Sequence, residues 1–246
     1  MEHIFKVAFI GLVSGVIGTG TGGLAAFCIN RISDRFLSLI LEFSAGLMTG
    51  VVCFELIPEA FEQGGVATTV SGILAGIAVI MAIENYIRKL KFIRKGNGNA
   101  GLLRAGILMA VGIALHNFPE GFAVGSGFEA SASLGIVLAV VIAVHDIPEG
   151  IAMAVPMRVG GFSKLKAFML TFLSGVPMGL GAMLGAVLGE ISRTFISACL
   201  GFAGGAMLYI VFGELLPESK RIYLGRLSSI GNVIGILCGI IVSTCN

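Results

Sequence analysis

The feature that most constrains this chain is a succession of apolar stretches, each long enough to cross a lipid bilayer. A spanning helix needs about 20 mostly apolar residues. Stretches of that kind occur at roughly 4–28, 36–60, 66–90, 102–127, 133–157, 165–189, 195–218 and 227–245. The mean hydropathy of +1.00 and the charged fraction of 12% also exclude an ordinary soluble domain. We therefore expect an all-α integral membrane protein with eight transmembrane helices, multi-pass in the cell membrane.

The positive charges lie on one side of this expected topology. All but two of the 16 Lys and Arg residues fall in the loops after the first, third, fifth and seventh stretches, the exceptions being Lys6 and Arg193. Lys and Arg accumulate in cytoplasmic loops. Both termini should therefore lie outside, with the basic segment 88–104 in the cytoplasm. No basic stripe indicates binding to nucleic acid.

An internal repeat relates the first three stretches to the last three. Residues 43–59 (FSAGLMTGVVCFELIPE) and 202–218 (FAGGAMLYIVFGELLPE) share eight identities in seventeen positions, and weaker matches relate 14–16 to 174–176 and 71–79 to 234–242. The first stretch runs inward and the sixth outward, so the two triplets must be inverted, as in transporters with a midplane site. We expect one transmembrane domain, 1–246, in a 3+2+3 inverted-repeat arrangement. The repeats would span about 1–90 and 165–246, around central helices at about 102–157.

The two central stretches carry a duplicated polar motif. ALHNFPEGFA at 114–123 and AVHDIPEGIA at 143–152 are related by an offset of 29. Residues i and i+4 share a helix face, so His116 with Glu120, and His145 with Glu149, each present an imidazole beside a carboxylate. Ionisable groups at mid-depth cost about 2.5–3.5 kcal/mol each on insertion scales and are usually functional.

This donor set indicates a divalent transition metal. Imidazole nitrogen with carboxylate oxygen suits zinc or a neighbouring first-row ion, whereas calcium and magnesium prefer oxygen ligands throughout. Asn117 and Asp146 lie three positions before the same glutamates, and Met48 offers a thioether near mid-depth, although a Met in an apolar helix more often fills the core. One His–Glu pair alone is as readily an internal hydrogen-bonded pair. The duplication favours a metal site.

Further glutamates flank this site along the expected path. Glu55 and Glu59 fall near the outer end of the second stretch, and the repeat puts Glu214 and Glu218 near the inner end of the seventh. Ordinary interfacial charge is the simpler interpretation for most carboxylates. Glu55 and Glu214 lie about a turn inside the helix ends, and we expect them to line a transport path.

These residues resemble a known family. HNFPEG and HDIPEG in consecutive helices, together with the AGxM...ELxPE segments, make the chain similar to the ZIP family of zinc and iron permeases, nearest to its compact prokaryotic members. The resemblance implies transport toward the cytosol across a bacterial inner membrane, no enzymatic activity and no prosthetic group. Zn²⁺ would be the transported substrate, with Fe²⁺, Mn²⁺, Cd²⁺ and Co²⁺ as alternatives. Related members are often dimeric, so a homodimer in the lipid bilayer is implied.

The same resemblance implies two metal positions. The first would consist of Met48, His116, Glu120, His145 and Glu149. The second would consist of Asn117 and Asp146, with Glu120 and Glu149 bridging, and Met207 and Glu214 would belong to the inner route. Met178 stands where similar proteins often carry a glutamate, so we expect one strong position and a weaker second one.

Two other functions are compatible with the motifs. A membrane-embedded zinc hydrolase would use His116, His145 and one carboxylate as ligands, with the other glutamate as general base. Such an enzyme has no reason to duplicate its site or to carry carboxylates at both faces. A metal receptor that transports nothing is the third alternative.

Overall fold

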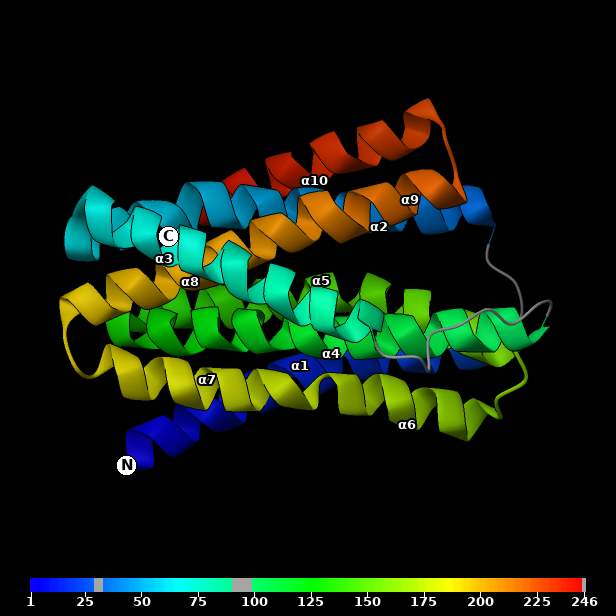
Figure 1. Cartoon of the computed structure of the whole chain (residues 1–246), viewed down its shortest axis with the longest axis horizontal. Coiled ribbons are helices and arrows are strands. Elements are labelled where there is room, and N and C mark those ends of the chain that lie inside the picture. The colour runs from blue at the N-terminus through cyan, green and yellow to red at the C-terminus, as the bar shows by residue number, and fades with distance from the viewer. Residues whose placement is uncertain (29–32, 90–98, 245–246) are drawn as a thin grey trace.

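The computed structural model describes residues 1–28, 33–89 and 99–244, and every regular element within these ranges is helical (Figure 1). The α-helices are α1 (Glu2–Cys28), α2 (Asp34–Val51), α3 (Ile57–Lys89), α4 (Asn99–Ala130), α5 (Ala132–Val159), α6 (Lys164–Ser174), α7 (Val176–Gly189), α8 (Arg193–Ile210), α9 (Leu216–Ile222) and α10 (Arg226–Thr244). Two π-helical turns, η1 (Val52–Leu56) and η3 (Val211–Leu215), interrupt the series. The all-α expectation is confirmed. Residues 90–98 of the expected cytoplasmic basic segment lie outside the described residues.

Six stretches in the described ranges are long and apolar enough to cross a membrane, as expected of a multi-pass membrane protein. The longest, Asp34–Ile83, has 50 residues. It reverses direction at Gly65, whose φ of 76° and ψ of 172° break the helix (Figure 1). Glycine adopts this backbone region without the steric penalty that other residues meet. The reversal falls between the stretches 36–60 and 66–90 that the sequence separates.

Basic residues gather at one end of the long axis of the bundle. Both chain ends lie toward one end of that axis, and the α5–α6 and α9–α10 connections lie at the other (Figure 1). Arg158 and Lys164 flank the first of these connections, and Lys220, Arg221 and Arg226 flank the second. These basic residues are therefore at the end opposite the termini.

Helix α3 packs against α8, and helix α10 packs against α2, through glycines at equivalent positions of the repeat. A side chain at Gly76 of α3 would collide with the carbonyl oxygen of Phe202 on α8, and one at Gly235 of α10 would collide with that of Phe43 on α2. Adding 159 to Phe43 and to Gly76 gives Phe202 and Gly235. The contacts thus make Gly76 equivalent to Gly235. The sequence match of 71–79 with 234–242 would instead make Gly76 equivalent to Gly239, one helical turn further along.

The central helices α4 and α5 are held by similar close approaches. A side chain at Gly121 of α4 would collide with the carbonyl oxygen of Met178 on α7, and one at Gly150 of α5 would collide with that of Thr19 on α1. The offset of 159 also relates Thr19 to Met178. Backbone contact therefore fixes where α4 and α5 stand, and with them the polar motifs that they carry.

Candidate metal site

The duplicated motif lies halfway along the two central helices. His145 is near the middle of the 28-residue α5, and His116 is near the middle of the 32-residue α4. With a rise of 1.5 Å per residue, the histidines are about 20–25 Å from their helix ends. If these helices span a bilayer with a hydrocarbon core about 30 Å thick, both histidines lie within that core.

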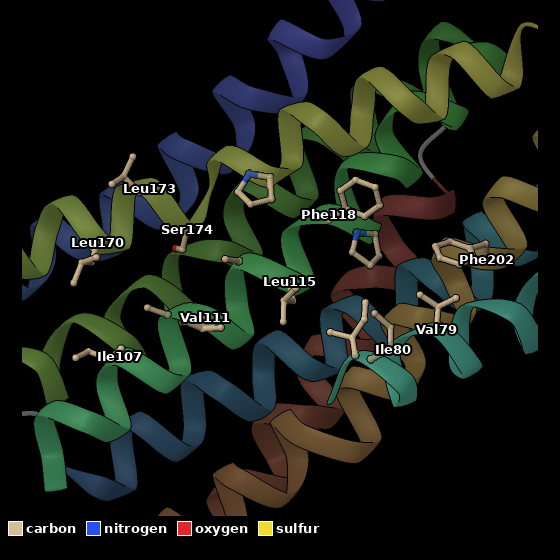
Figure 2. A pocket seen from close by; sticks show the side chains of 15 residues that line it. Val79, Ile80, Ile107, Val111, Leu115, Phe118, Leu170, Leu173, Ser174 and Phe202 are labelled. Atoms are coloured by element: carbon tan, nitrogen blue, oxygen red, sulfur yellow. The ribbon is translucent and has the colours of Figure 1, made fainter. Parts of the chain in front are cut away.

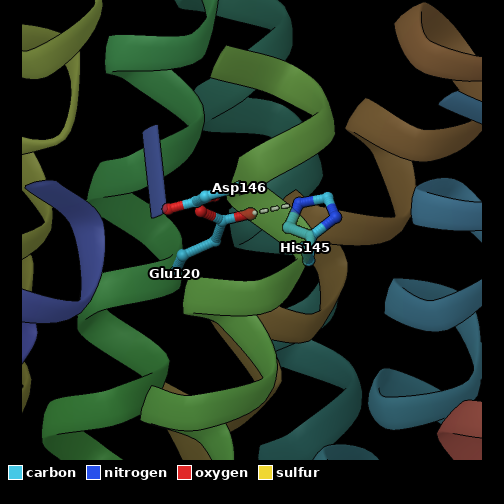
Figure 3. Close-up of side chains that lie close together, drawn as sticks. All are labelled: Glu120, His145 and Asp146. Atoms are coloured by element: carbon cyan, nitrogen blue, oxygen red, sulfur yellow. Dashed lines mark hydrogen bonds and ion pairs between the residues drawn. The ribbon is translucent and has the colours of Figure 1, made fainter. Parts of the chain in front are cut away.

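Glu120, His145 and Asp146 form a compact cluster of buried side chains (Figure 3). Their ligand atoms all lie within 4.8 Å of one another. His145 Nε2 is 3.2 Å from Glu120 Oε1 and 3.3 Å from Glu149 Oε1. The structure thus brings together four of the predicted ligands, from two helices.

The charge in this cluster is unbalanced. Glu120, Asp146 and Glu149 are each 0% exposed, and both oxygens of Asp146 and the Oε2 of Glu120 have no hydrogen-bond partner among the described residues. Burying a carboxylate without compensation costs several kcal/mol, and one imidazole carries at most one positive charge. A divalent cation would supply both the missing charge and contacts for the unused oxygens.

On α4, Asn117 occupies the position that Asp146 has on α5, and it makes a different contact. The Asn117 side-chain amide donates to the carbonyl oxygen of Ser174, at 2.7 Å. Ser174 is the last residue of α6, beside the break before α7. This hydrogen bond fixes the orientation of Asn117, whose buried Oδ1 has no hydrogen-bond partner in the part of the chain that the structure describes.

The other predicted ligands are buried on the surrounding helices. His116 is 5% exposed and lies one turn before Glu120, and Met48 is 3% exposed on α2. Met178 is fully buried on α7, next to Gly15 and Gly121. Met207 is buried on α8. Their contribution to metal binding stays a prediction.

The predicted path residues are described only in part. Glu55 in η1 and Glu59 in α3 are half-buried, and Gln63 donates to Glu59 Oε1 at 2.7 Å. The side chain of Glu214 lies outside those that the structure describes. The role of these glutamates in a path stays a prediction.

Sequence reasoning missed Ser44 of α2. Its hydroxyl donates to the carbonyl oxygen of His145 at 3.1 Å, and the same oxygen is in hydrogen-bonding contact with Nδ1 of that ring. The repeat contains a signal for this residue, because the alignment of 43–59 with 202–218 pairs Ser44 with Ala203. One half of the repeat has a hydroxyl at this position and the other does not.

An apolar cavity of about 510 Å³ lies beside the polar cluster, between α3, α4 and the α6–α7 segment (Figure 2). Val111, Leu115, Leu170 and Leu173 are typical of its lining, and Ser174 is the one polar residue among the described side chains that line it. A cation gains nothing from such walls. The cavity is therefore not the candidate metal site.

Comparison with known proteins supports the family resemblance. The family model described as ZIP Zinc transporter matches residues 94–245. The chain is 37% identical over 255 residues to the zinc transporter ZupT of Chlorobium limicola and 34% identical over 253 residues to that of Streptococcus mutans, each match covering 96% of both chains. It is 33% identical over 272 residues to the zinc transporter ZupT of Clostridium perfringens, covering 96% of this chain and 94% of the relative. These similarities extend well beyond the motifs, and they give the hydrolase alternative no support.

Proposed function

The chain belongs to the ZIP family of zinc transporters, and we propose that it carries Zn²⁺ across the membrane toward the cytosol through the buried cluster on α4 and α5. The spacing of 3.2 and 3.3 Å from His145 Nε2 to the two glutamate oxygens carries this proposal. Tetrahedral zinc with bonds of about 2.0–2.1 Å separates neighbouring ligand atoms by about 3.3 Å. A bound ion would leave the two distances from Nε2 almost unchanged. Family membership makes the protein a transporter rather than an enzyme.

The proposed ligands form two positions of unequal strength. The first comprises Glu120, His145 and Glu149, with His116 and Met48 completing the shell. The second comprises Asn117 and Asp146, with the two glutamates bridging. The oxygens of Asp146, which have no hydrogen-bond partner among the side chains and backbone that the structure describes, favour this second position, but the buried Met178 brings no carboxylate to it. We expect it to bind metal more weakly.

The proposed architecture has eight spans in the 3+2+3 inverted-repeat arrangement, with both termini outside. The reversal at Gly65 separates the second span from the third, and α6 with α7 forms one span interrupted at Gly175. The reciprocal contacts of Gly76 and Gly235 support a repeat that relates the outer triplets. The basic residues at the end opposite the termini support a cytoplasmic location for that end.

Metal would follow a polar route through the bundle. It would enter past Glu59 and Glu55, lose its water to the His and Glu ligands, and leave past Met207 and Glu214. Neutral imidazole and ionised carboxylates are the forms that bind a divalent ion. The two outer glutamates are half-buried, as suits groups that meet both water and the bundle.

Reconstitution tests this function. Proteoliposomes loaded with a zinc-sensitive dye should admit Zn²⁺, and the double variant Glu120→Ala, Glu149→Ala should admit none. The matched control removes two exposed carboxylates, Glu62 and Glu190, by the same substitution and should keep wild-type influx. Equal influx in wild type and in the Glu120, Glu149 double variant would contradict the site assignment.

The same vesicles test which ions share the site. Competition with Fe²⁺, Mn²⁺, Cd²⁺ and Co²⁺ should reduce zinc influx wherever an ion accepts the His and Glu ligands. Native mass spectrometry of the protein in detergent should show the proposed homodimer. A mass of one chain alone under all conditions would contradict it.

A further inference from the structure

We propose that Ser44 is a positioning residue that fixes the tautomer of His145 and thereby presents the Nε2 lone pair of that ring to the transported metal. This inference rests on the proposed function, since it concerns how the same site accepts its cargo. Ser44 lies on α2 and His145 on α5, so the contact joins an outer helix to a central one.

The geometry of Ser44 determines where the ring proton must be. Ser44 is 0% exposed and His145 is 2% exposed, so water does not compete for either. The Ser44 hydroxyl donates to the backbone carbonyl of His145 at 3.1 Å. A hydroxyl has one proton to donate. In this arrangement its oxygen is the acceptor toward Nδ1 of the ring, and Nδ1 carries the proton.

This protonation leaves the correct nitrogen available to the metal. A neutral imidazole with its proton on Nδ1 has its lone pair on Nε2. Nε2 is the atom that faces Glu120 and Glu149. The opposite tautomer would put a proton where the ion has to bind. Ligating histidines are commonly held by a hydrogen bond from their other ring nitrogen, and losing that partner typically costs about 10–100-fold in metal affinity.

The hydroxyl that holds His145 is present in one of the two repeats. The offset of 159 that relates η1 to η3 relates Ser44 to Ala203, which has no hydroxyl. Ser44 contacts the histidine whose Nε2 faces both glutamates. Ser44 therefore helps to explain why a duplicated motif yields one strong metal position.

Substitution of Ser44 by Ala tests the role directly. Purified Ser44→Ala should bind Zn²⁺ about 10–100-fold more weakly than wild type in competition with a fluorescent chelator. Ser44→Thr keeps the hydroxyl and should restore affinity. Thr49→Ala is the matched control, since it removes a hydroxyl from the same helix that donates to the Ala45 carbonyl at 2.8 Å. It should leave affinity unchanged.

A spectroscopic readout separates positioning from packing. The chain has three histidines, so nitrogen-15 histidine spectra of the protein are simple, and His3→Gln and His116→Gln assign them. With Zn²⁺ bound, the ring of His145 should keep its proton on Nδ1 in wild type and in Ser44→Thr, and should coordinate the ion through either nitrogen in Ser44→Ala. This measurement on wild type decides the point even where Ser44→Ala folds poorly.

The outcomes distinguish this inference from the proposed function. A wild-type His145 protonated on Nε2 would overturn the inference, as would a Ser44→Ala variant with unchanged tautomer and affinity. Vesicles that admit no zinc, together with the expected tautomer in the purified protein, would overturn transport and leave the role of Ser44 standing.

Discussion

The two central helices carry nearly the same motif, HNFPEG on α4 and HDIPEG on α5, in different surroundings. On α5, His145 is held by Ser44 and faces two glutamates, and neither oxygen of Asp146 has a hydrogen-bond partner within the described ranges. On α4, Asn117 uses its amide to bind the end of α6. The two copies of the motif therefore make different contacts. Asn117 links α4 to the end of α6, whereas Asp146 lies in the cluster with Glu120 and His145.

Replacing each histidine in turn by alanine should give the largest difference in zinc affinity between the two copies of the motif. His145→Ala should weaken zinc binding more than about 100-fold, because a direct ligand should matter more than the outer partners of a ligand, whose loss costs about 10–100-fold. His116→Ala should cost less, since the compact cluster pairs Glu120 and Asp146 with His145. Calorimetric zinc titration of both variants measures this. Equal losses would show that the copies contribute alike.

Reciprocal exchange at the next position sharpens the comparison. Asp146→Asn removes a charge with unused oxygens and should lower zinc affinity about tenfold, within the range for a lost charged contact. Asn117→Asp removes the donor to Ser174 and places a carboxylate against a carbonyl oxygen. It should destabilise the protein by about 1–3 kcal/mol, measured by thermal unfolding in detergent. An Asn117→Asp variant as stable as wild type would show that this hydrogen bond does not hold α4 to α6.

The close approach of α1 to Asp146 gives a smaller effect. A methyl group at Gly18 would lie 2.5 Å from Asp146 Cβ and 2.6 Å from the Ala143 carbonyl oxygen. Gly18→Ala should therefore cost about 1–3 kcal/mol of stability through overpacking, with a severalfold loss of zinc affinity. Gly213→Ala is the control, because a methyl there meets nothing closer than 3.7 Å. Thermal unfolding and zinc titration should separate the two variants, and identical behaviour would argue against the tight α1–α5 contact.

Substitution of Met48 should have the smallest effect on zinc affinity. Met48→Leu conserves volume, so packing changes should be slight, and loss of a weak thioether ligand should reduce zinc affinity about threefold. Met157→Leu, at another buried methionine on α5, is the control. Unchanged affinity in Met48→Leu would identify Met48 as a packing residue.

The sequence predicts the parts of this protein that depend on local patterns. Apolar length predicts membrane helices, and the spacing of His and Glu predicts that each pair shares a helix face, because both follow from helix geometry alone. The cluster of Glu120, His145 and Asp146 joins residues from two neighbouring helices. These residues could be predicted as metal ligands because both helices carry the same motif.

Contacts between distant segments could not be predicted in this way. Ser44 and His145 are 101 positions apart, and only the packing of α2 on α5 makes them partners. The register of the repeat is a second example. Glycines recur every four residues in 72–76 and in 231–239, so a sequence match tolerates a slip of one turn. The contacts of Gly76 and Gly235 remove that ambiguity.

The two π-helical turns have a consequence for how this protein can change in length. A π turn contains one residue more than an α turn, and one residue corresponds to a rotation of about 100°. Deleting one residue from η1 or from η3 would restore a continuous α-helix and rotate every residue beyond it, including Glu59 after η1. Substitutions on the lipid-facing surface should accumulate freely in evolution. Insertions and deletions of single residues at these two turns should be eliminated, even though each changes no predicted ligand.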